Sequence, residues 1–166
     1  MSASHFHSVT FSESLPAVRL GFDLVRIGAI RESLETFGQA FRQRLFTDGE
    51  LCYADTGISM FAERLAARFA AKEAVIKALD LSDAGINWRQ IEVVKRDSGD
   101  CELVLHDRVA AIASAMKVLR LALSLSHEGD YAGAVVLAFF DSSELSISNS
   151  SLVSGDLNWR GFCATS

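Results

Sequence analysis

Residues 68–79 read Arg-Phe-Ala-Ala-Lys-Glu-Ala-Val-Ile-Lys-Ala-Leu, the most strongly patterned stretch of the chain. It is rich in alanine, which has the highest helix propensity, and it predicts a helix that runs from Ser59 or Met60 to about Leu79. Apolar residues recur in it at the spacing that places them on one buried face. The candidate core residues of this helix are Phe61, Leu65, Phe69, Ala70, Ile76 and Leu79.

The sequence before this helix predicts a strand and further helical segments. Residues 18–25 alternate between apolar and other side chains, which is the period of a strand. A helix is expected from Arg26 to about Thr36, whereas Phe37–Phe46 has only rough helical spacing and stays ambiguous. Residues 47–50, Thr-Asp-Gly-Glu, have the form of a capping box and predict a short helix that begins there.

The sequence after the long helix predicts a loop over residues 80–87 and then a first pair of strands. These strands are Trp88–Lys95 and Cys101–Leu105, and a turn at residues 97–100 joins them. Asp107 then has the chemistry of a cap for a helix that runs through Met116.

The last two predicted strands differ in pattern. In Val118–Ser126 the leucines 119, 121, 123 and 125 share one face, with Arg120, Ala122, Ser124 and Ser126 on the other. Tyr131–Phe140 is almost continuously apolar, which predicts a strand buried on both faces. The whole order of elements predicts an α+β fold with helices packed on a largely antiparallel sheet.

Length and composition are those of one globular domain. The chain has 166 residues, of which 49% are hydrophobic and 22% charged. We expect a domain over residues 18–140, a polar lead-in over residues 1–17 and a serine-rich tail over residues 141–166. No secretion signal and no apolar run of membrane-spanning length is evident. The three separated cysteines, Cys52, Cys101 and Cys163, favour a reducing cytoplasm over a disulfide framework.

Charge argues for an anionic ligand or partner. The formal net charge of −5 disfavours a general nucleic-acid binder, which carries a basic face. Two segments are nonetheless basic: residues 18–45 hold five arginines against three acids, and residues 62–77 hold four bases against two acids. These segments would suit an anionic partner. The alternative is that they are ordinary solvated helix faces.

The long helix carries the first candidate site. On a helix, Arg64, Arg68 and Lys72 form one ridge, and Glu73 and Lys77 lie on the adjacent one. Cations so spaced can hold phosphates, while a carboxylate among them can hold a metal against the same phosphates. In the alternative interpretation, Glu73 and Lys77 form a helical ion pair and the arginines are solvated.

Two further positions carry polar chemistry. Asp23 lies near the end of a predicted strand, where it would either ligate a cation or cap the helix that begins near Arg26. Ser124-Leu125-Ser126-His127-Glu128 lies at a strand corner, where hydroxyls and an imidazole would bind phosphate or sugar oxygens, or His127 would be only a turn residue. The chain has no P-loop, no Gly-x-Gly-x-x-Gly after a strand, no Gly-x-Ser-x-Gly and no evident nucleophile of its own.

Taken together, these segments resemble the holo-acyl-carrier-protein synthase family, the short single-domain type of 4′-phosphopantetheinyl transferase. The resemblance runs from about Arg19 to Phe140. Its most specific part is the Arg-Phe-Ala-Ala-Lys-Glu-Ala block. The matching blocks are residues 21–25, Phe46-Thr47 with Glu50-Leu51, residues 68–74 with Lys77-Ala78, Trp88, residues 91–93, Leu105-His106, residues 124–127 and Tyr131-Ala132.

The resemblance implies a reaction and roles for residues. A phosphopantetheine arm would move from coenzyme A to a serine of an acyl carrier protein, which releases 3′,5′-ADP. Asp23 and Glu73 would hold Mg2+, and Glu73 and Lys77 would be the catalytic residues, with Lys77 reaching the phosphates. The residues implied to hold coenzyme A are Arg68, Lys72, Lys77, Ser126 and His127.

The resemblance also implies partners. Carrier proteins of the family are acidic, and the arginines expected to dock them here are Arg26, Arg31, Arg42 and Arg44. Similar family members are homotrimers with the site between neighbouring subunits. The carrier pathway, whether fatty acid, polyketide or another, stays open.

The chain departs from the family pattern in the loop at residues 80–85, where two added acids would repel the phosphates if they pointed inward. Two functions outside the enzyme class also stay open. One is a catalytically silent module that binds the carrier protein, and the other is a structural protein whose tail is the functional part.

Overall fold

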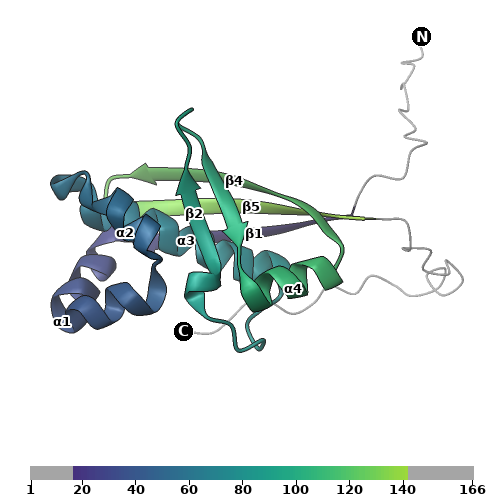
Figure 1. Cartoon of the computed structure of the whole chain (residues 1–166). Coiled ribbons are helices and arrows are strands. Elements are labelled where there is room, and N and C mark those ends of the chain that lie inside the picture. The colour runs from purple at the N-terminus through teal and green to yellow at the C-terminus, as the bar shows by residue number, and fades with distance from the viewer. Residues whose placement is uncertain (1–16, 142–166) are drawn as a thin grey trace, which may run out of the picture.

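The structure is a computed structural model that describes residues 17–141 of the chain. The predicted lead-in and the serine-rich tail lie almost entirely outside this range. Within it the fold is α+β, as predicted, and the strands pair antiparallel throughout. The domain has a three-stranded sheet, a separate β-hairpin and helices around them (Figure 1).

The three-stranded sheet has the order β1-β5-β4, so that β1 (Ala17–Arg26) and β4 (Val118–Glu128) are its two outer strands. The last strand of the chain, β5 (Tyr131–Phe140), lies between them. The hairpin pairs β2 (Ile91–Lys95) with β3 (Cys101–Leu105). Residues 88–90, predicted as the start of the first hairpin strand, instead form the 3-10 turn η2 (Trp88–Gln90), closed by a capping box from Asn87.

The helices gather around α3 (Phe61–Leu79), the long helix that the alanine-rich block predicts. In Figure 1, α1 (Ile27–Leu45) and α2 (Asp48–Asp55) lie at one end of α3, and α4 (Asp107–Ala115) lies at the other. The 3-10 turn η1 (Ile58–Met60) leads into α3. The ambiguous residues 37–46 continue α1 after a kink at Gly38, whose φ of 52° is the left-handed conformation that glycine adopts readily.

Of the two helix caps that the sequence predicts, the one at Thr47 is confirmed and the one at Asp107 is wrong. The capping box at Thr47 is confirmed: the backbone N–H of Glu50 donates to the Thr47 hydroxyl, and the backbone N–H of Thr47 donates to the Glu50 carboxylate. Asp107 does not cap α4. It is the first residue of that helix, and His106 occupies the cap position without a side-chain hydrogen bond.

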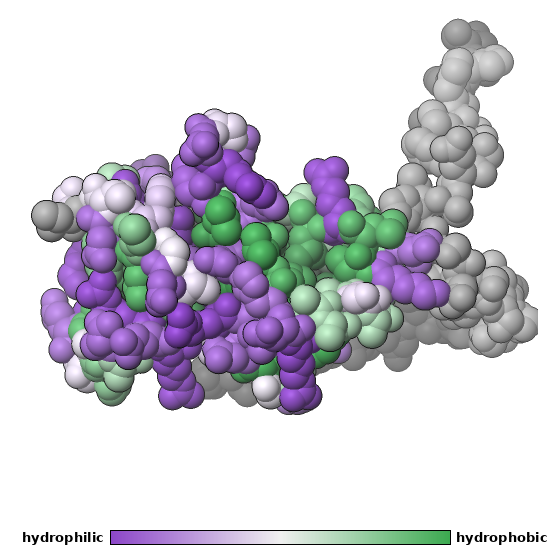
Figure 2. Space-filling model, in the orientation of Figure 1, coloured by the Kyte–Doolittle hydropathy of each residue, from purple (hydrophilic) through white to green (hydrophobic). Residues whose placement is uncertain are grey.

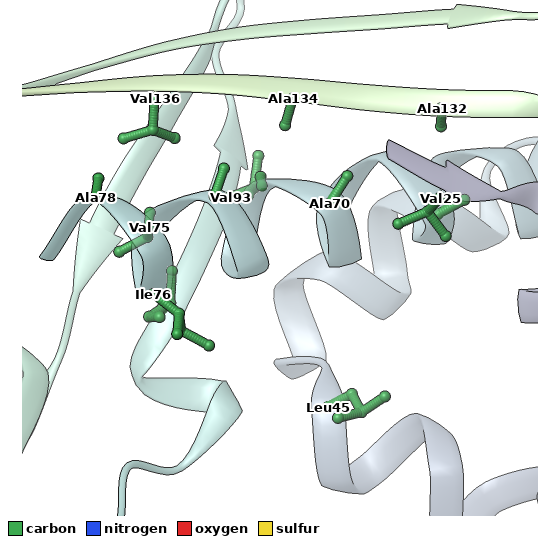
Figure 3. Close-up of a cluster of buried hydrophobic side chains, with 14 of the residues drawn as sticks. Val25, Leu45, Ala70, Val75, Ile76, Ala78, Val93, Ala132, Ala134 and Val136 are labelled. Carbon is green, nitrogen blue, oxygen red and sulfur yellow. The ribbon is translucent and has the colours of Figure 1, made fainter. Parts of the chain in front are cut away.

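The centre of the fold is the seam between α3 and the inner face of the sheet. Strand β5 alternates, and its residues Ala132, Ala134 and Val136 point at α3 while Ala70 and Ala78 point back (Figure 3). Small side chains on both surfaces let the helix approach closely. At Gly21 of β1 a Cβ atom would lie 1.9 Å from the Ala74 carbonyl oxygen, so only glycine fits there.

The outer face of the sheet is apolar and partly open. Val18, Leu20, Phe22 and Leu24 of β1 are between 48% and 62% exposed, although each is a large hydrophobic residue. The prediction that Tyr131–Phe140 is buried on both faces is therefore wrong within residues 17–141, because nothing in this part of the chain covers the outer side. The leucine face of β4 is also broken at Leu119, which a bulge between Val118 and Arg120 leaves 66% exposed.

Polar surface covers much of the rest. Figure 2 shows one side of the molecule, on which hydrophilic side chains cover α1 and α2 and apolar ones gather beside the β2–β3 hairpin. No helix within residues 17–141 is long and apolar enough to cross a membrane.

The close approach at Gly21 yields a prediction. Gly21→Ala should lower the free energy of unfolding by about 3 kcal/mol, because the new methyl group meets backbone atoms of α3 that cannot move separately. Gly28→Ala is the matched control, since its Cβ would meet only Arg26 Nε at 4.0 Å; it should be neutral or stabilising within α1. Urea denaturation of both variants measures the difference. Equal stability for the two would mean that the seam tolerates extra volume.

Candidate active site

The first site residue, Asp23, lies on the inner face of β1 beside α3. Its carboxylate Oδ1 is 2.6 Å from Lys77 Nζ, and Lys77 also donates to the Phe22 carbonyl oxygen at 3.1 Å. Asp23 therefore does not cap α1, whose cap position is Arg26. The alternative interpretation, a helical ion pair between Glu73 and Lys77, is not what the structure shows: Lys77 instead pairs with Asp23 on the strand.

Glu73 completes this group one helical turn before Lys77. Partial burial raises the pKa of Glu73, and the nearby Asp23 carboxylate raises it further, while Lys77 acts in the opposite direction. The two carboxylates thus repel each other across the seam, and one ammonium does not fully offset them. The two carboxylates cannot move apart freely, because the packing of α3 on β1 fixes the backbone positions of both residues.

This group fits a magnesium ion. Two carboxylates that repel each other gain from a divalent cation between them, and oxygen is the ligand that Mg2+ prefers. Within residues 17–141 no cluster of three or more His, Cys, Asp and Glu side chains has metal-binding geometry. A site with two carboxylates suits Mg2+, which commonly takes one or two protein carboxylates together with water and substrate phosphates.

Lys72, expected at the phosphates, lies instead in the protein interior. Its side chain is fully buried and its ammonium is 2.8 Å from Glu50 Oε2. The same ammonium donates to the Trp88 and Ile91 carbonyl oxygens, so its three donors are all satisfied. Burial lowers the pKa of Lys72, and the Glu50 carboxylate opposes that effect.

Glu50 is the centre of this buried polar cluster. Besides Lys72 it accepts hydrogen bonds from the backbone N–H groups of Thr47 and Val93, and so joins α2, α3 and β2. A second carboxylate, Glu92, accepts from the Thr47 hydroxyl at 2.7 Å and lies 2.8 Å from His106 Nε2. The cluster holds α3 on the side away from Asp23.

Arg68 also faces inward. It is 2% exposed, its guanidinium lies 4.2 Å from the centre of the Tyr53 ring, and Nη1 donates to the Arg64 carbonyl oxygen. Its Nε and Nη2 have no hydrogen-bond partner within the described residues. The prediction that these cations and Glu73 share a side of the helix is therefore wrong, because the ridge of Arg64, Arg68 and Lys72 turns toward α2 and only Lys77 stays with Glu73.

The remaining expected coenzyme A residues lie on the opposite outer strand. Ser126 and His127 are on β4, and β5 separates them from Asp23 on β1. Their side chains point to opposite faces of the sheet, as neighbours on a strand do. His127 faces the α3 side, where its Nε2 lies 3.1 Å from Glu63 Oε1. One subunit therefore does not bring Ser126 and His127 to the two carboxylates.

The four expected docking arginines fall into separate groups. Arg26 and Arg31 line a cavity of about 320 Å3 at the start of α1, together with Asp130. Arg44 is exposed beyond the Gly38 kink, where it lines an apolar cavity of about 420 Å3. Arg42 is engaged within the fold, because it pairs with Asp55 at 3.2 Å and stacks on Phe61.

Sequence reasoning missed two residues of these networks. Glu50 was expected only as part of a capping box, although the same carboxylate holds Lys72. Glu63 had no role, and no local signal could have supplied one, because its partner His127 lies far along the chain.

The buried pair predicts a strong asymmetry between variants. Lys72→Met should lower the free energy of unfolding by about 3–5 kcal/mol, because it leaves the Glu50 carboxylate buried without its countercharge. The double variant Glu50→Gln/Lys72→Met should be more stable than Lys72→Met alone. Chemical denaturation measures the free energy of unfolding of both variants. A double variant that is no more stable than Lys72→Met alone would contradict the assignment.

Partial burial of Glu73 and its repulsion by the Asp23 carboxylate predict that the site destabilises the fold. The raised pKa of Glu73 means that its ionised form is disfavoured in the folded state, so Glu73→Gln should raise Tm in the presence of a chelator at pH 7–8. The gain should be small, about 1–2 °C, because solvent screens a partly exposed group. It should vanish as the pH falls through the pKa of Glu73, where the wild-type carboxyl is neutral too. A loss of Tm at neutral pH would contradict it.

Comparison with known proteins identifies the family. A family model described as the 4′-phosphopantetheinyl transferase superfamily matches residues 19–136. The holo-[acyl-carrier-protein] synthase of Gloeobacter violaceus is 40% identical over 124 residues, which are 74% of this chain and 94% of the relative. That of Chlamydia trachomatis serovar L2 is 40% identical over 120 residues, with 72% and 97% covered.

Solved structures agree with the sequence matches. A Chronobacterium ammoniagenes ACPS-CoA complex superposes with a TM-score of 0.68 at 36% identity, and covers 75% of this chain and 98% of its own. Holo-[acyl-carrier-protein] synthase from Neisseria meningitidis superposes with a TM-score of 0.63 at 30% identity, and covers 72% and 96%. The matched range contains the strand of Asp23, the whole of α3 and the corner at His127. The chain therefore belongs to the 4′-phosphopantetheinyl transferase superfamily, and within it to the holo-acyl-carrier-protein synthases.

Proposed function

We propose that this protein transfers 4′-phosphopantetheine from coenzyme A to a serine of an acidic apo acyl carrier protein, releases 3′,5′-ADP, and depends on Mg2+. The observation that carries the proposal is the grouping of Asp23, Glu73 and Lys77 across the α3–β1 seam. Membership of the holo-acyl-carrier-protein synthases supports the substrates. The cytoplasmic location expected from the cysteines stays a prediction.

Asp23 and Glu73 would hold Mg2+ against the pyrophosphate of coenzyme A. Bound there, the ion would offset phosphate charge and orient the pyrophosphate. Lys77 is half exposed and holds its ammonium beside Asp23, so it would stabilise negative charge on the departing 3′,5′-ADP. The carrier serine oxygen would form the new bond to phosphorus and give up its proton to water as the bond to 3′,5′-ADP breaks, so the enzyme needs no nucleophile of its own.

A homotrimer with the site between subunits would reconcile the dispersed coenzyme A residues. Within one subunit β5 separates Ser126 and His127 from Asp23, whereas a neighbouring copy of β4 would bring them to the carboxylates. The exposed apolar face of β1 supports such an assembly, because isolated soluble subunits rarely leave a continuous row of large apolar side chains in water. Arg68 and Lys72 would then act through the fold, as buried supports of α3.

The carrier protein would dock beside α1. An apolar cavity there is lined by Phe37, Ala40, Phe41, Arg44, Leu45, Phe69 and Trp88. Arg44 and Arg89 also line an adjoining polar cavity. Two cations therefore lie at the edge of the apolar cavity. An apolar cavity with a basic rim suits an acidic helix that presents one apolar side chain. Arg26 and Arg31 would add two cations at the start of α1, in a cavity that Glu32, Glu63 and Asp130 also line, whereas Arg42 would not contribute.

The test is intact-mass analysis of an apo acyl carrier protein incubated with this protein, coenzyme A and Mg2+, beside a reaction with chelator. We expect a mass gain of one phosphopantetheine that the chelator abolishes. Glu73→Ala should abolish the gain while the protein stays folded. Binding of the carrier without any gain, by the wild-type protein and across several carriers, would instead indicate a silent carrier-binding module.

Docking predicts a separation of the two Michaelis constants. Arg44→Glu should raise the KM for the carrier protein about tenfold or more and leave the KM for coenzyme A unchanged, because a reversed charge repels an acidic partner. Arg31→Glu should act in the same direction. Arg96→Glu, in the exposed β2–β3 turn, is the matched control and should change neither constant. An equal rise in both constants for Arg44→Glu would contradict the docking surface.

A further inference from the structure

The contact between His127 and Glu63 joins the outer strand β4 to the first turn of the central helix α3. Glu63 lies in the first turn of α3, and its carboxylate Oε1 is 3.1 Å from His127 Nε2 at the end of β4. The carboxylate is the more enclosed partner: the Glu63 side chain is 26% exposed and that of His127 is 57% exposed. One edge of the imidazole is therefore held by α3, and the rest of the ring is open to solvent.

The chemistry of the pair fixes the orientation of the ring. The contact is an ion pair of 3.1 Å, and because a carboxylate only accepts hydrogen bonds, a neutral His127 ring facing it would carry its proton on Nε2. Nδ1 is then the ring nitrogen left to meet a ligand. A histidine held in this way has one tautomer and one orientation, which a freely rotating side chain lacks.

We propose that Glu63 is a positioning residue, which holds His127 so that Nδ1 faces the nucleotide part of coenzyme A. This inference rests on the proposed function, since His127 is a coenzyme A residue only there. Glu63 sits too far along α3 from Glu73 to join the two carboxylates, and it acts through the ring that it holds. By holding the His127 ring, Glu63 reduces the conformational entropy that this side chain loses when the nucleotide binds.

An alternative role for Glu63 is purely electrostatic. The residue lines the cavity of about 320 Å3 that also contains Arg26 and Arg31, where its negative charge would act on both arginines. Glu32 lines the same cavity and pairs with Arg26 at 3.7 Å, yet has no contact with His127 among the ion pairs of the described chain. Glu32 is therefore a matched control for charge without orientation.

The kinetic test is a double-mutant cycle between Glu63 and His127. We expect Glu63→Ala to raise the KM for coenzyme A about fivefold with little change in kcat, and Glu63→Gln to restore most of the affinity because its amide oxygen still accepts from Nε2. In the His127→Ala background, Glu63→Ala should have no further effect. Glu32→Ala should leave the KM for coenzyme A unchanged.

A spectroscopic test separates this inference from the proposed function. The ring nitrogens of His127, followed by 15N NMR on the full-length protein, should report the Nε2–H tautomer in the wild type and in Glu63→Gln, and a mixture of tautomers in Glu63→Ala. Effects of Glu63→Ala and His127→Ala on the KM that add fully, or a tautomer that does not respond to Glu63→Ala, would overturn the inference. A wild-type protein that transfers nothing, although its tautomer responds, would instead contradict the proposed function.

Discussion

The contact of helix α3 with the sheet is the constraint on which the rest of the structure depends. Gly21 leaves no room for a side chain against the Ala74 carbonyl, and alanines line both surfaces of the seam. A helix that packs on small residues lies closer to the strand than one that packs on leucines. Short acidic side chains on β1 and α3 thereby come within electrostatic reach of each other, and Lys77 bridges to Asp23. The proposed chemistry depends on that distance.

The opposite side of α3 is held by buried polar contacts. Glu50 and Lys72 connect the helix to α2 and β2 through hydrogen bonds that leave no donor of the ammonium unsatisfied. Apolar packing alone tolerates small rotations of a helix, whereas a directional cluster of this kind defines one orientation. Lys72 and Glu73 are adjacent in sequence but face opposite environments. Lys72 stabilises the fold, whereas Glu73 lowers the stability of the metal-free protein, as functional groups often do.

The sequence predicted those features that local chemistry controls. Alternation identified β1, alanine content identified α3, and the Thr47 capping box placed the start of α2. Prediction from the sequence failed where a residue contacts side chains that are distant in the chain. Helical spacing placed Lys72 beside Glu73, but burial by α2 and β2 decided its surroundings. A bulge turned Leu119 outward, and the α3–β4 contact that holds His127 has no local pattern. Tyr131–Phe140 was expected to be buried on both faces, because the sequence does not show whether a strand is covered by its own chain.

Direct measurement of metal binding tests the central claim, that the seam assembles a two-carboxylate site. Mn2+ bound to the protein in the presence of coenzyme A can be counted by electron paramagnetic resonance in the wild type, Asp23→Asn and Glu73→Gln, with Glu102→Gln as an exposed control on β3. A site shared between β1 and α3 predicts one tightly bound ion per chain in the wild type and in the control, and its loss in both site variants. Retention of tight binding in either site variant would contradict a site shared between β1 and α3.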